Sequence, residues 1–404
     1  MHLFALLHKT FEEQLPKVHH TRLNSLMTVC ATAASENKLY LTGLGRAISN
    51  SNKESSNIQK VDRLLGNGAL QAERDSFYKV MQSYVIQKYS SPWIHIDWTC
   101  INSTTNIYVL RASLSMKGRS IVIFEKSYLK KMENNHATHK EFLNKLKSLL
   151  PSNVKPIIVT DAGFRAPWFS YILKLGWDFV GRLRNKNLIF LDKTAHWRLS
   201  SSYFEQATSI PTCIGQGLLT EEGKVPAQFV LFKGKNKGRH RLNKNKKISN
   251  SGKNKRYATA NKEPWLLVTS LKAKEKPVLI TNIYRQRMRI EENIRDTKCS
   301  HYGLGLKNSL TCCPQRMDIL LLIAAIATLA AWIAGLFTKS NGNASHFQAH
   351  SAKFTSALSY VFLGRRVLKK GLDITKEQFQ YACLLLFNLV LFTQQEKPHY
   401  GHIL

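Results

Sequence analysis

The feature that most constrains this chain is a long uncharged apolar run near its C-terminal end. Residues Ile319 to Phe337 read ILLLIAAIATLAAWIAGLF, which is long enough to cross a bilayer as a helix. A second run, ACLLLFNLVLF from Ala382 to Phe392, is too short to span. Two readings stay open, a membrane hairpin or two helices buried together in a C-terminal helical domain. The second is favoured because alanine lets helices pack closely.

The charge of the chain limits its partners. Its 404 residues carry 59 Lys and Arg against 26 Asp and Glu, a formal net charge of +33. Such an excess repels itself unless a polyanion relieves it, and the common polyanions are DNA and RNA. An anionic membrane surface is the alternative. Seven scattered cysteines without a C-x-x-C pair argue against a zinc ribbon or a disulfide framework and favour a reducing interior.

The hydrophobic pattern changes along the chain and predicts more than one domain, as the length also does. Residues 1–88 have apolar positions at helical spacing, typical of a small helical bundle or of a DNA-reading helical domain. From Pro92 the order is strand, strand, strand, helix, strand, helix, strand, which predicts a mixed α/β sheet covered by helices. Residues from about 311 onward are helical again.

Residues 185–264 interrupt the α/β pattern with short β runs and polar stretches. From Lys233 to Arg256 there are eleven Lys and Arg and no acid. Such a run is either a solvated loop or a loop that closes on a phosphate backbone.

Two aspartates are placed where sites gather in α/β sheets. Asp97 is predicted to end one apolar strand and Asp161 to end another. Binding sites collect at the carboxyl ends of strands, and a carboxylate there is costly to desolvate without a partner. For either residue the alternative is a cap that starts the following turn.

The stretch YRQRMRIEENIRDTK, from Tyr284 to Lys298, is predicted to be a single amphipathic helix. On a helical wheel Ile283, Ile290 and Ile294 form the buried stripe. Tyr284, Arg287, Glu291 and Lys298 form a band beside it. Glu292 faces outward, where we expect it to pair with Arg289 or Arg295. The alternative for the band is a surface helix braced by ion pairs.

Three carboxylates, Asp97, Asp161 and Glu291, can together bind a divalent metal ion. Oxygen ligands favour Mg²⁺ or Mn²⁺ over Zn²⁺. A pair of such ions can hold the attacking and leaving oxygens of a phosphodiester. His136 and His139 have the spacing of metal ligands, but we expect them to be surface or capping residues.

The motifs of the chain resemble those of a known family. Tyr284, Arg287, Glu291 and Lys298 match the Tyr-Arg-Glu-Lys signature of one branch of the DDE transposases of bacterial insertion sequences. The stretches DWT, RASLSMKGRS, DAGF, EPW, RDTK and YGLGL are similar to those of the transposase of the tetracycline-resistance transposon and its relatives. The resemblance covers nearly the whole chain.

The resemblance implies a fold and a domain order. It implies an α/β, ribonuclease H-like catalytic core at residues 89–310, with a β-rich insertion at about 185–264. A helical DNA-binding domain would occupy residues 1–88. A C-terminal helical region, residues 311–404, would complete the core and help to pair two protomers as a homodimer on DNA. This argues against a membrane protein and for a cytoplasmic, nucleoid-associated one.

The resemblance also implies roles for single residues. Asp97, Asp161 and Glu291 would be the catalytic, metal-binding triad, with two Mg²⁺ ions for which Mn²⁺ can substitute. Tyr284, Arg287 and Lys298 would contact the double-stranded DNA of the transposon end. Trp265 would stack on a base flipped out near the cut, although it lies about two residues closer to the tyrosine than in the family; a core tryptophan is the alternative.

The activity implied is cut-and-paste transposition. Such enzymes bind terminal inverted repeats, cleave both strands through a hairpin intermediate and join the 3′-OH ends to target DNA. The alternative is a DNA-binding regulator or decayed copy without catalysis.

Overall fold

The computed structural model describes residues 2–86, 89–102, 104–184, 187–234, 243, 247–252, 254, 263–348 and 358–395. Contacts between residues group the chain into two units. Unit 1 joins Met1–Pro156 to Met288–Leu404, and unit 2 is Ile157–Arg287. Much of the basic stretch Lys233–Arg256 lies outside the described residues, so its contact with DNA stays a prediction.

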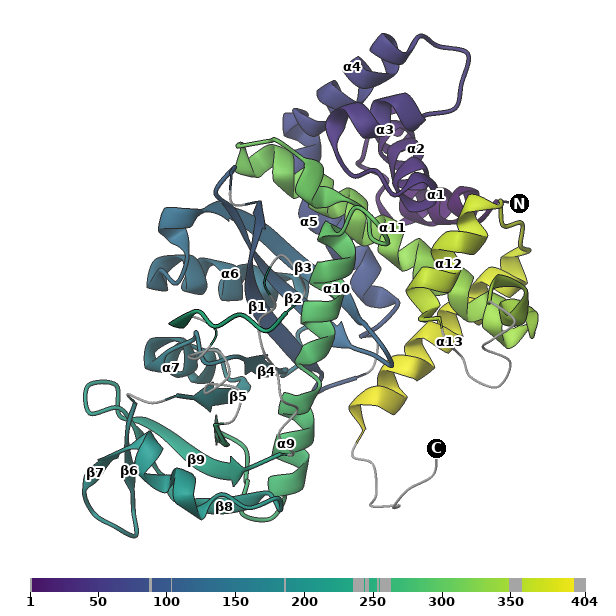
Figure 1. The fold of residues 1–404 in the computed structure, drawn as a ribbon. Helices are drawn as coiled ribbons and strands as arrows, with labels where there is room; N and C mark the ends of the chain where they lie inside the picture. The colour runs from purple at the N-terminus through teal and green to yellow at the C-terminus, as the bar shows by residue number, and fades with distance from the viewer. Residues whose placement is uncertain are drawn as a thin grey trace. The chain divides into compact units, whose positions relative to one another are not determined.

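Unit 1 contains a three-stranded sheet and most of the helices (Figure 1). Its strands, in the order β3-β2-β1, are β1 (Trp93–Asn102), β2 (Ile107–Ser115) and β3 (Ser120–Leu129). Its helices are α1 (Leu3–Gln14), α2 (His20–Glu36), α3 (Leu41–Ala47), α4 (Glu54–Leu65), α5 (Gly68–Ser83), α6 (His136–Leu149), α10 (Met288–Lys298), α11 (Pro314–Ser340), α12 (Tyr360–Lys369) and α13 (Lys376–Gln394). Short 3₁₀ helices cover Lys130–Met132, Leu306–Asn308 and Asn343–Phe347.

The predicted hairpin is confirmed as the centre of the unit 1 sheet. Strand β2 pairs antiparallel with both β1 and β3. The turn between β2 and β3 contains Gly118 at φ 88°, a left-handed conformation that favours glycine. Because side chains alternate along a strand, the sheet has two chemically different faces.

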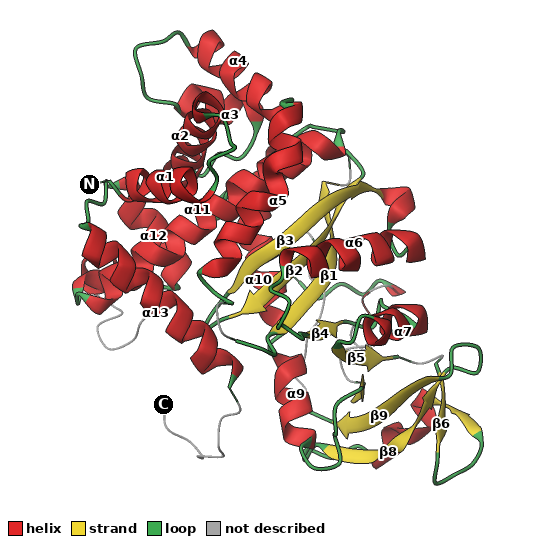
Figure 2. Cartoon of the chain, turned by 180° about the vertical axis from the view of Figure 1, so that it is seen from behind, coloured by secondary structure: helices red, strands yellow, loops and turns green. Residues whose placement is uncertain are grey.

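Helices α6 and α10 cover opposite faces of this sheet (Figures 1 and 2). On the α6 face, Phe124 lies 5.1 Å from Phe142 of α6 between ring centroids, and the Trp98 indole Nε1 donates to His139 Nε2 at 3.0 Å. His139 is therefore buried, and the prediction that it lies at the surface or caps a helix is wrong; Asn135 caps α6 instead. The predicted exposure of His136 is confirmed.

The long apolar run forms α11, which lies between other elements of unit 1. It packs against α2, α5, α12, α13 and β3, so every side of the helix meets protein. Among the described residues, α11 is one helix that is long and apolar enough to cross a membrane, and its most apolar window is fully buried. The favoured reading is confirmed for α11, which is buried and packs against α13, the helix of the second apolar run. It is wrong for α13, which is only partly buried and exposes Leu384 and Phe392.

Among its described residues, unit 2 contains a seven-stranded mixed sheet and the helices α7 and α9. The strands are β4 (Ile157–Thr160), β5 (Asp178–Leu183), β6 (Leu188–Leu191), β7 (Trp197–Leu199), β8 (Thr212–Leu219), β9 (Val225–Phe232) and β10 (Trp265–Thr269), in the order β4-β5-β10-β9-β8-β6-β7. The helices are α7 (Ala166–Lys174) and α9 (Pro277–Arg285), with a 3₁₀ helix at Ser200–Gln206.

Only β4 and β5 are parallel within unit 2; its other described pairs are antiparallel. Helix α7 connects these two strands, as a parallel crossover requires. Its Phe169 packs on Phe179 of β5, with ring centroids 4.7 Å apart. The predicted order of elements from β1 to β5, and with it the mixed α/β class, is confirmed.

Candidate active site

Asp97 lies inside β1 and not at its end. The strand continues to Asn102 because its ladder with β2 extends through Thr99 and Cys100. The prediction that Asp97 ends the strand is therefore wrong. The polar residues after it do not mark a strand end, because they belong to a strand with one polar face. In register, Asp97 lies opposite Arg111 of β2, which lies opposite Glu125 of β3.

Residues directly opposite each other in an antiparallel pair project from the same face of the sheet. Asp97, Arg111 and Glu125 therefore form one row across three strands, which we call the charged row. The Arg111 Nε donates to Glu125 Oε2 at 2.7 Å, and both side chains are fully buried. Burial raises the pKa of Glu125, and Arg111 opposes that shift.

Helix α10 covers the face that carries the charged row. Ile290 and Ile294 are buried, as predicted, and so are two polar residues, Asn293 and Thr297. The Arg111 Nη1 donates to Asn293 Oδ1 at 2.6 Å and to Thr297 Oγ1 at 3.2 Å. One arginine thus joins the middle of the sheet to two successive turns of the helix.

Lys298 attaches the last turn of α10 to β1. Its Nζ donates to the Cys100 carbonyl at 2.8 Å and to Thr99 Oγ1 at 3.2 Å. Burial lowers the pKa of Lys298, and the charge of Arg111 lowers it further. Thr99 is two residues beyond Asp97 on the same face of β1.

Glu291 lies on the same side of α10 as Lys298, about two turns earlier. Its side chain is half-buried. Unit 1 therefore places Asp97, Glu291 and Lys298 on two elements that face each other, one strand and one helix.

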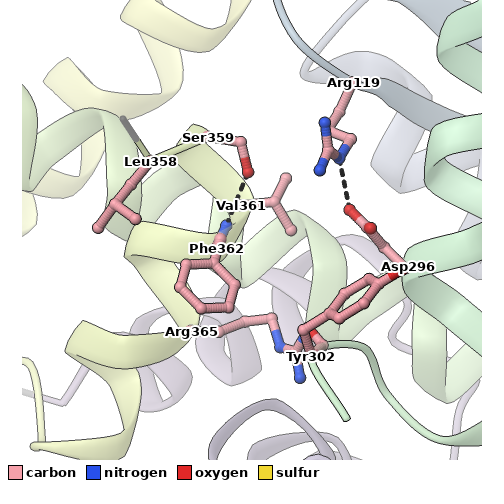
Figure 3. A pocket seen from close by; sticks show the side chains of 8 residues that line it. All are labelled: Arg119, Asp296, Tyr302, Leu358, Ser359, Val361, Phe362 and Arg365. Atoms are coloured by element: carbon pink, nitrogen blue, oxygen red, sulfur yellow. Dashed lines mark hydrogen bonds and ion pairs between the residues drawn. The ribbon is translucent and has the colours of Figure 1, made fainter. Parts of the chain in front are cut away.

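Glu292, the neighbouring acid, projects to a different side of α10. It pairs with Arg289 at 3.6 Å, as predicted, and also with Arg119 at 3.6 Å. Arg119 Nε also pairs with Asp296 Oδ2 at 2.5 Å, one turn further along α10 (Figure 3). These two acids of α10 are thus held by an arginine from the β2–β3 turn.

Tyr284 and Glu291 do not share one helix. Gln286 and Arg287 form a turn, so α9 ends at Arg285 and α10 begins at Met288. The single wheel drawn through Tyr284–Lys298 is therefore wrong, although its buried isoleucines and its separation of Glu291 from Glu292 are confirmed. Gln, Arg and Met favour helix, so local propensity does not predict the break; it falls where unit 2 ends and unit 1 resumes.

Asp161 directly follows β4, as predicted. Its Oδ1 accepts a hydrogen bond from the Gly163 N–H at 2.8 Å, so it does start the turn before α7. The side chain is half-buried. A carboxylate has several lone pairs, and one turn bond leaves it able to bind a cation.

Tyr284 is the centre of an aromatic and cationic cluster in unit 2. Its ring lies edge-on to Trp265, with centroids 5.0 Å apart, and the Arg287 Cζ lies 6.0 Å from its centroid. Burial raises the pKa of Tyr284; Arg287 and Arg182 oppose the shift, and Asp161 adds to it. Unit 2 therefore brings together the four residues predicted there: Asp161, Trp265, Tyr284 and Arg287.

Arg182 was not predicted to belong to this cluster. It lies in β5, and burial lowers its pKa while Tyr284, by charge and by a side-chain hydrogen bond, raises it. Arg111 and Glu125 were missed in the same way. The available signal was a charged residue within an otherwise apolar strand, in DFVGRL, IYVLRAS and SIVIFEK.

A comparison with protein-family models matches residues 127–329, which are 203 of the 404 residues, to the transposase DDE domain. The chain belongs to this family. The matched range contains Asp161, Trp265, Tyr284, Glu291 and Lys298, and it begins after Asp97. A search of curated proteins gave no match. The family identifies the chain as a DDE-class transposase, an enzyme class that acts on DNA and generally uses divalent metal ions.

The donor type of this transposase suits such an ion. Asp97 and Glu291 supply carboxylate oxygens on two facing elements of unit 1, and unit 2 carries a further carboxylate, Asp161. Hard divalent cations prefer oxygen ligands. Within the described ranges, no group of three or more His, Cys, Asp and Glu side chains lies close enough to hold a metal ion.

Proposed function

We propose that this transposase performs cut-and-paste transposition. It binds terminal inverted repeats, cleaves both strands through a hairpin intermediate and joins the freed 3′-OH ends to target DNA. It belongs in this proposal to the branch with the Tyr-Arg-Glu-Lys signature, similar to the transposase of the tetracycline-resistance transposon. Its catalytic core is ribonuclease H-like, and the helical regions at residues 1–88 and 311–404 bind DNA and pair protomers.

Asp97, Asp161 and Glu291 are the proposed metal-binding and catalytic residues. They would hold two Mg²⁺ ions, or Mn²⁺, which when bound supply charge stabilisation at the phosphate and a more acidic attacking water or hydroxyl. In this proposal the carboxylates, which come from β1, from the residue after β4 and from α10, orient the reacting groups.

The cationic and aromatic residues have the other proposed roles. Lys298, held at β1, places an ammonium beside Asp97's strand and offsets charge on the scissile phosphate. Arg287 and Tyr284 contact DNA near the cut, and Trp265 stacks on a flipped base. The proposed active complex is a homodimer on double-stranded DNA in the cytoplasm, without a membrane.

One observation on this chain supports the proposed site in addition to the family match. Asp97 projects from the sheet face that α10 covers, and Lys298 of α10 bonds to β1 two and three residues further along. Glu291 lies on that same side of α10, whereas Glu292 lies on another side, next to Arg119 and Arg289. This placement supports Glu291 rather than Glu292 as the proposed ligand.

The test uses the full chain, Mg²⁺ and duplexes from the DNA that flanks its gene, with imperfect inverted repeats. The parent should nick and then hairpin these ends. Glu291→Ala should abolish cleavage and spare end binding. The matched control Glu292→Ala should stay within about threefold of the parent, because Asp296 still holds Arg119. A parent that binds ends but cuts none, with Asp97→Ala leaving every activity unchanged, would favour a regulator without catalysis.

A further inference from the structure

The charged row includes two buried residues that the proposed chemistry does not use. Arg111 is 1% exposed and Glu125 is 0% exposed. A buried ion pair is weak evidence for stability, because removing two charges from water costs as much as their attraction returns. Its retention here needs another reason, and the contacts of Arg111 indicate one.

We propose that Arg111 is a positioning residue that sets the rotation of α10 on the sheet and so the place of Glu291 relative to Asp97. This rests on the proposed function of those two carboxylates. Arg111 bonds to Asn293 and Thr297, which are one turn apart on one line of the helix. If α10 rolled about its own axis, both side chains would move away from the Arg111 guanidinium.

A second contact, on another line of the helix, prevents α10 from turning about the first. Arg119 pairs with Glu292 and Asp296, also one turn apart, on a line rotated by about 100° from the first. The two arginines come from the same β2–β3 hairpin. Glu291 lies on neither line but on the side of α10 that also carries Lys298. The two contacts together set where that side lies on the sheet.

Glu125 holds the guanidinium in the orientation that this requires. Its Oε2 accepts from Nε, which leaves Nη1 directed at α10. Asn293 is fixed in turn, because its Nδ2 donates to the Ser120 carbonyl at 3.1 Å. The planar fork of arginine makes both contacts at once, which the single ammonium of lysine cannot.

Arg111→Lys is the main test because it keeps the charge and loses the fork. Mn²⁺ binding is measured by the paramagnetic resonance of free Mn²⁺, and binding of an end duplex by gel shift. We expect the Mn²⁺ dissociation constant to rise about tenfold, the size found for residues that orient metal ligands, with end binding within about twofold. Thr297→Val removes only one of the two contacts of Arg111 with α10, so it should raise the Mn²⁺ dissociation constant about threefold.

Arg74→Met is the matched control. Arg74 pairs with Asp318 in a second buried ion pair of unit 1, between α5 and α11. It should lower the melting temperature yet leave Mn²⁺ affinity unchanged. Equal Mn²⁺ affinity in Arg111→Lys and the parent, or equal weakening in Arg74→Met, would overturn the inference. A parent that neither binds Mn²⁺ nor cleaves ends would instead remove the proposed function, and this inference with it.

Discussion

Trp265 packs edge-on against Tyr284, with ring centroids 5.0 Å apart, and also contacts Phe232 at 5.6 Å. Trp265 nevertheless stays half-exposed. Trp265 therefore has features of both predicted roles. It packs against other rings, as a core residue does, and it is reached by solvent, as a base-stacking residue must be. A half-exposed ring held by two others is a rigid platform on which a base can stack.

Trp265→Ala should therefore reduce hairpin formation about 10- to 100-fold, the range of one lost base-stacking contact. Trp265→Phe should retain most of the activity. The flipped base is followed with 2-aminopurine placed beside the cut, whose fluorescence rises when it leaves the base stack. Full hairpin formation by Trp265→Ala would assign this residue to the core alone.

Lys298→Met should weaken binding of the transposon end and lower the slope of log affinity against log salt by about one. The reason is that its ammonium, fixed by Thr99 and Cys100, is the group proposed to meet a phosphate. Affinity is measured between about 50 and 200 mM salt.

Lys298→Arg separates charge from position. The guanidinium keeps the positive charge, so the salt slope should match the parent. Cleavage should still fall, because the longer, planar group cannot repeat the compact contacts at β1. An unchanged slope in Lys298→Met would show that this residue does not contact a phosphate.

Much of the architecture was predictable because it follows from local patterns. The β2–β3 hairpin, α6, α7 and the buried helix α11 each show a clear periodicity or a turn residue such as Gly118. The end of β1 and the break at Gln286 were not predictable, since both depend on partners distant in sequence. Pairing of Thr99 and Cys100 with Val109 and Tyr108 of β2 extends the first, and the second falls at the border between the two units.

The candidate site divides in the same way. Glu291 could be distinguished from Glu292 because helical spacing places them on different sides of α10. Asp161 could be singled out because an apolar strand ends directly before it. Arg111 and Arg182 could not be assigned roles, because a charged residue in an apolar strand indicates a buried partner without naming it.

His139 gives the transposase a stability that depends on pH. Burial, and then the charge of His136, lowers the pKa of His139 from 6.5 to about 4. Between these values the unfolded chain binds a proton that the folded protein does not, so stability rises with pH. As pH falls from about 6.5 to about 4, the free energy of unfolding should decrease by on the order of 3 kcal/mol.

Urea unfolding at pH 7 and pH 5 measures this effect. His139→Gln keeps an acceptor for the Trp98 indole and removes the titration, so its loss of stability between the two pH values should be smaller than the parent's. Equal losses in both proteins would assign the pH dependence to other groups.

Gly364 of α12 allows the closest approach to the buried helix α11. A Cβ at Gly364 would lie 1.8 Å from the Ala331 carbonyl oxygen, and one at Gly335 would lie 1.9 Å from that of Tyr360. Both obstacles are backbone, so the two helices would have to separate. Gly364→Ala should lower the free energy of unfolding by about 3 kcal/mol, at the upper end for overpacked cores.

Gly68→Ala is the matched control for this change. Gly68 is the first residue of α5, and a Cβ there meets no atom within 4 Å. Alanine restricts the unfolded chain more than glycine does, so stability should stay level or rise by about 0.5–1 kcal/mol. Both variants are compared in urea without detergent. If Gly364→Ala were as stable as the parent, or if the parent needed detergent to stay in solution, the apolar run would not be the buried helix that the structure describes.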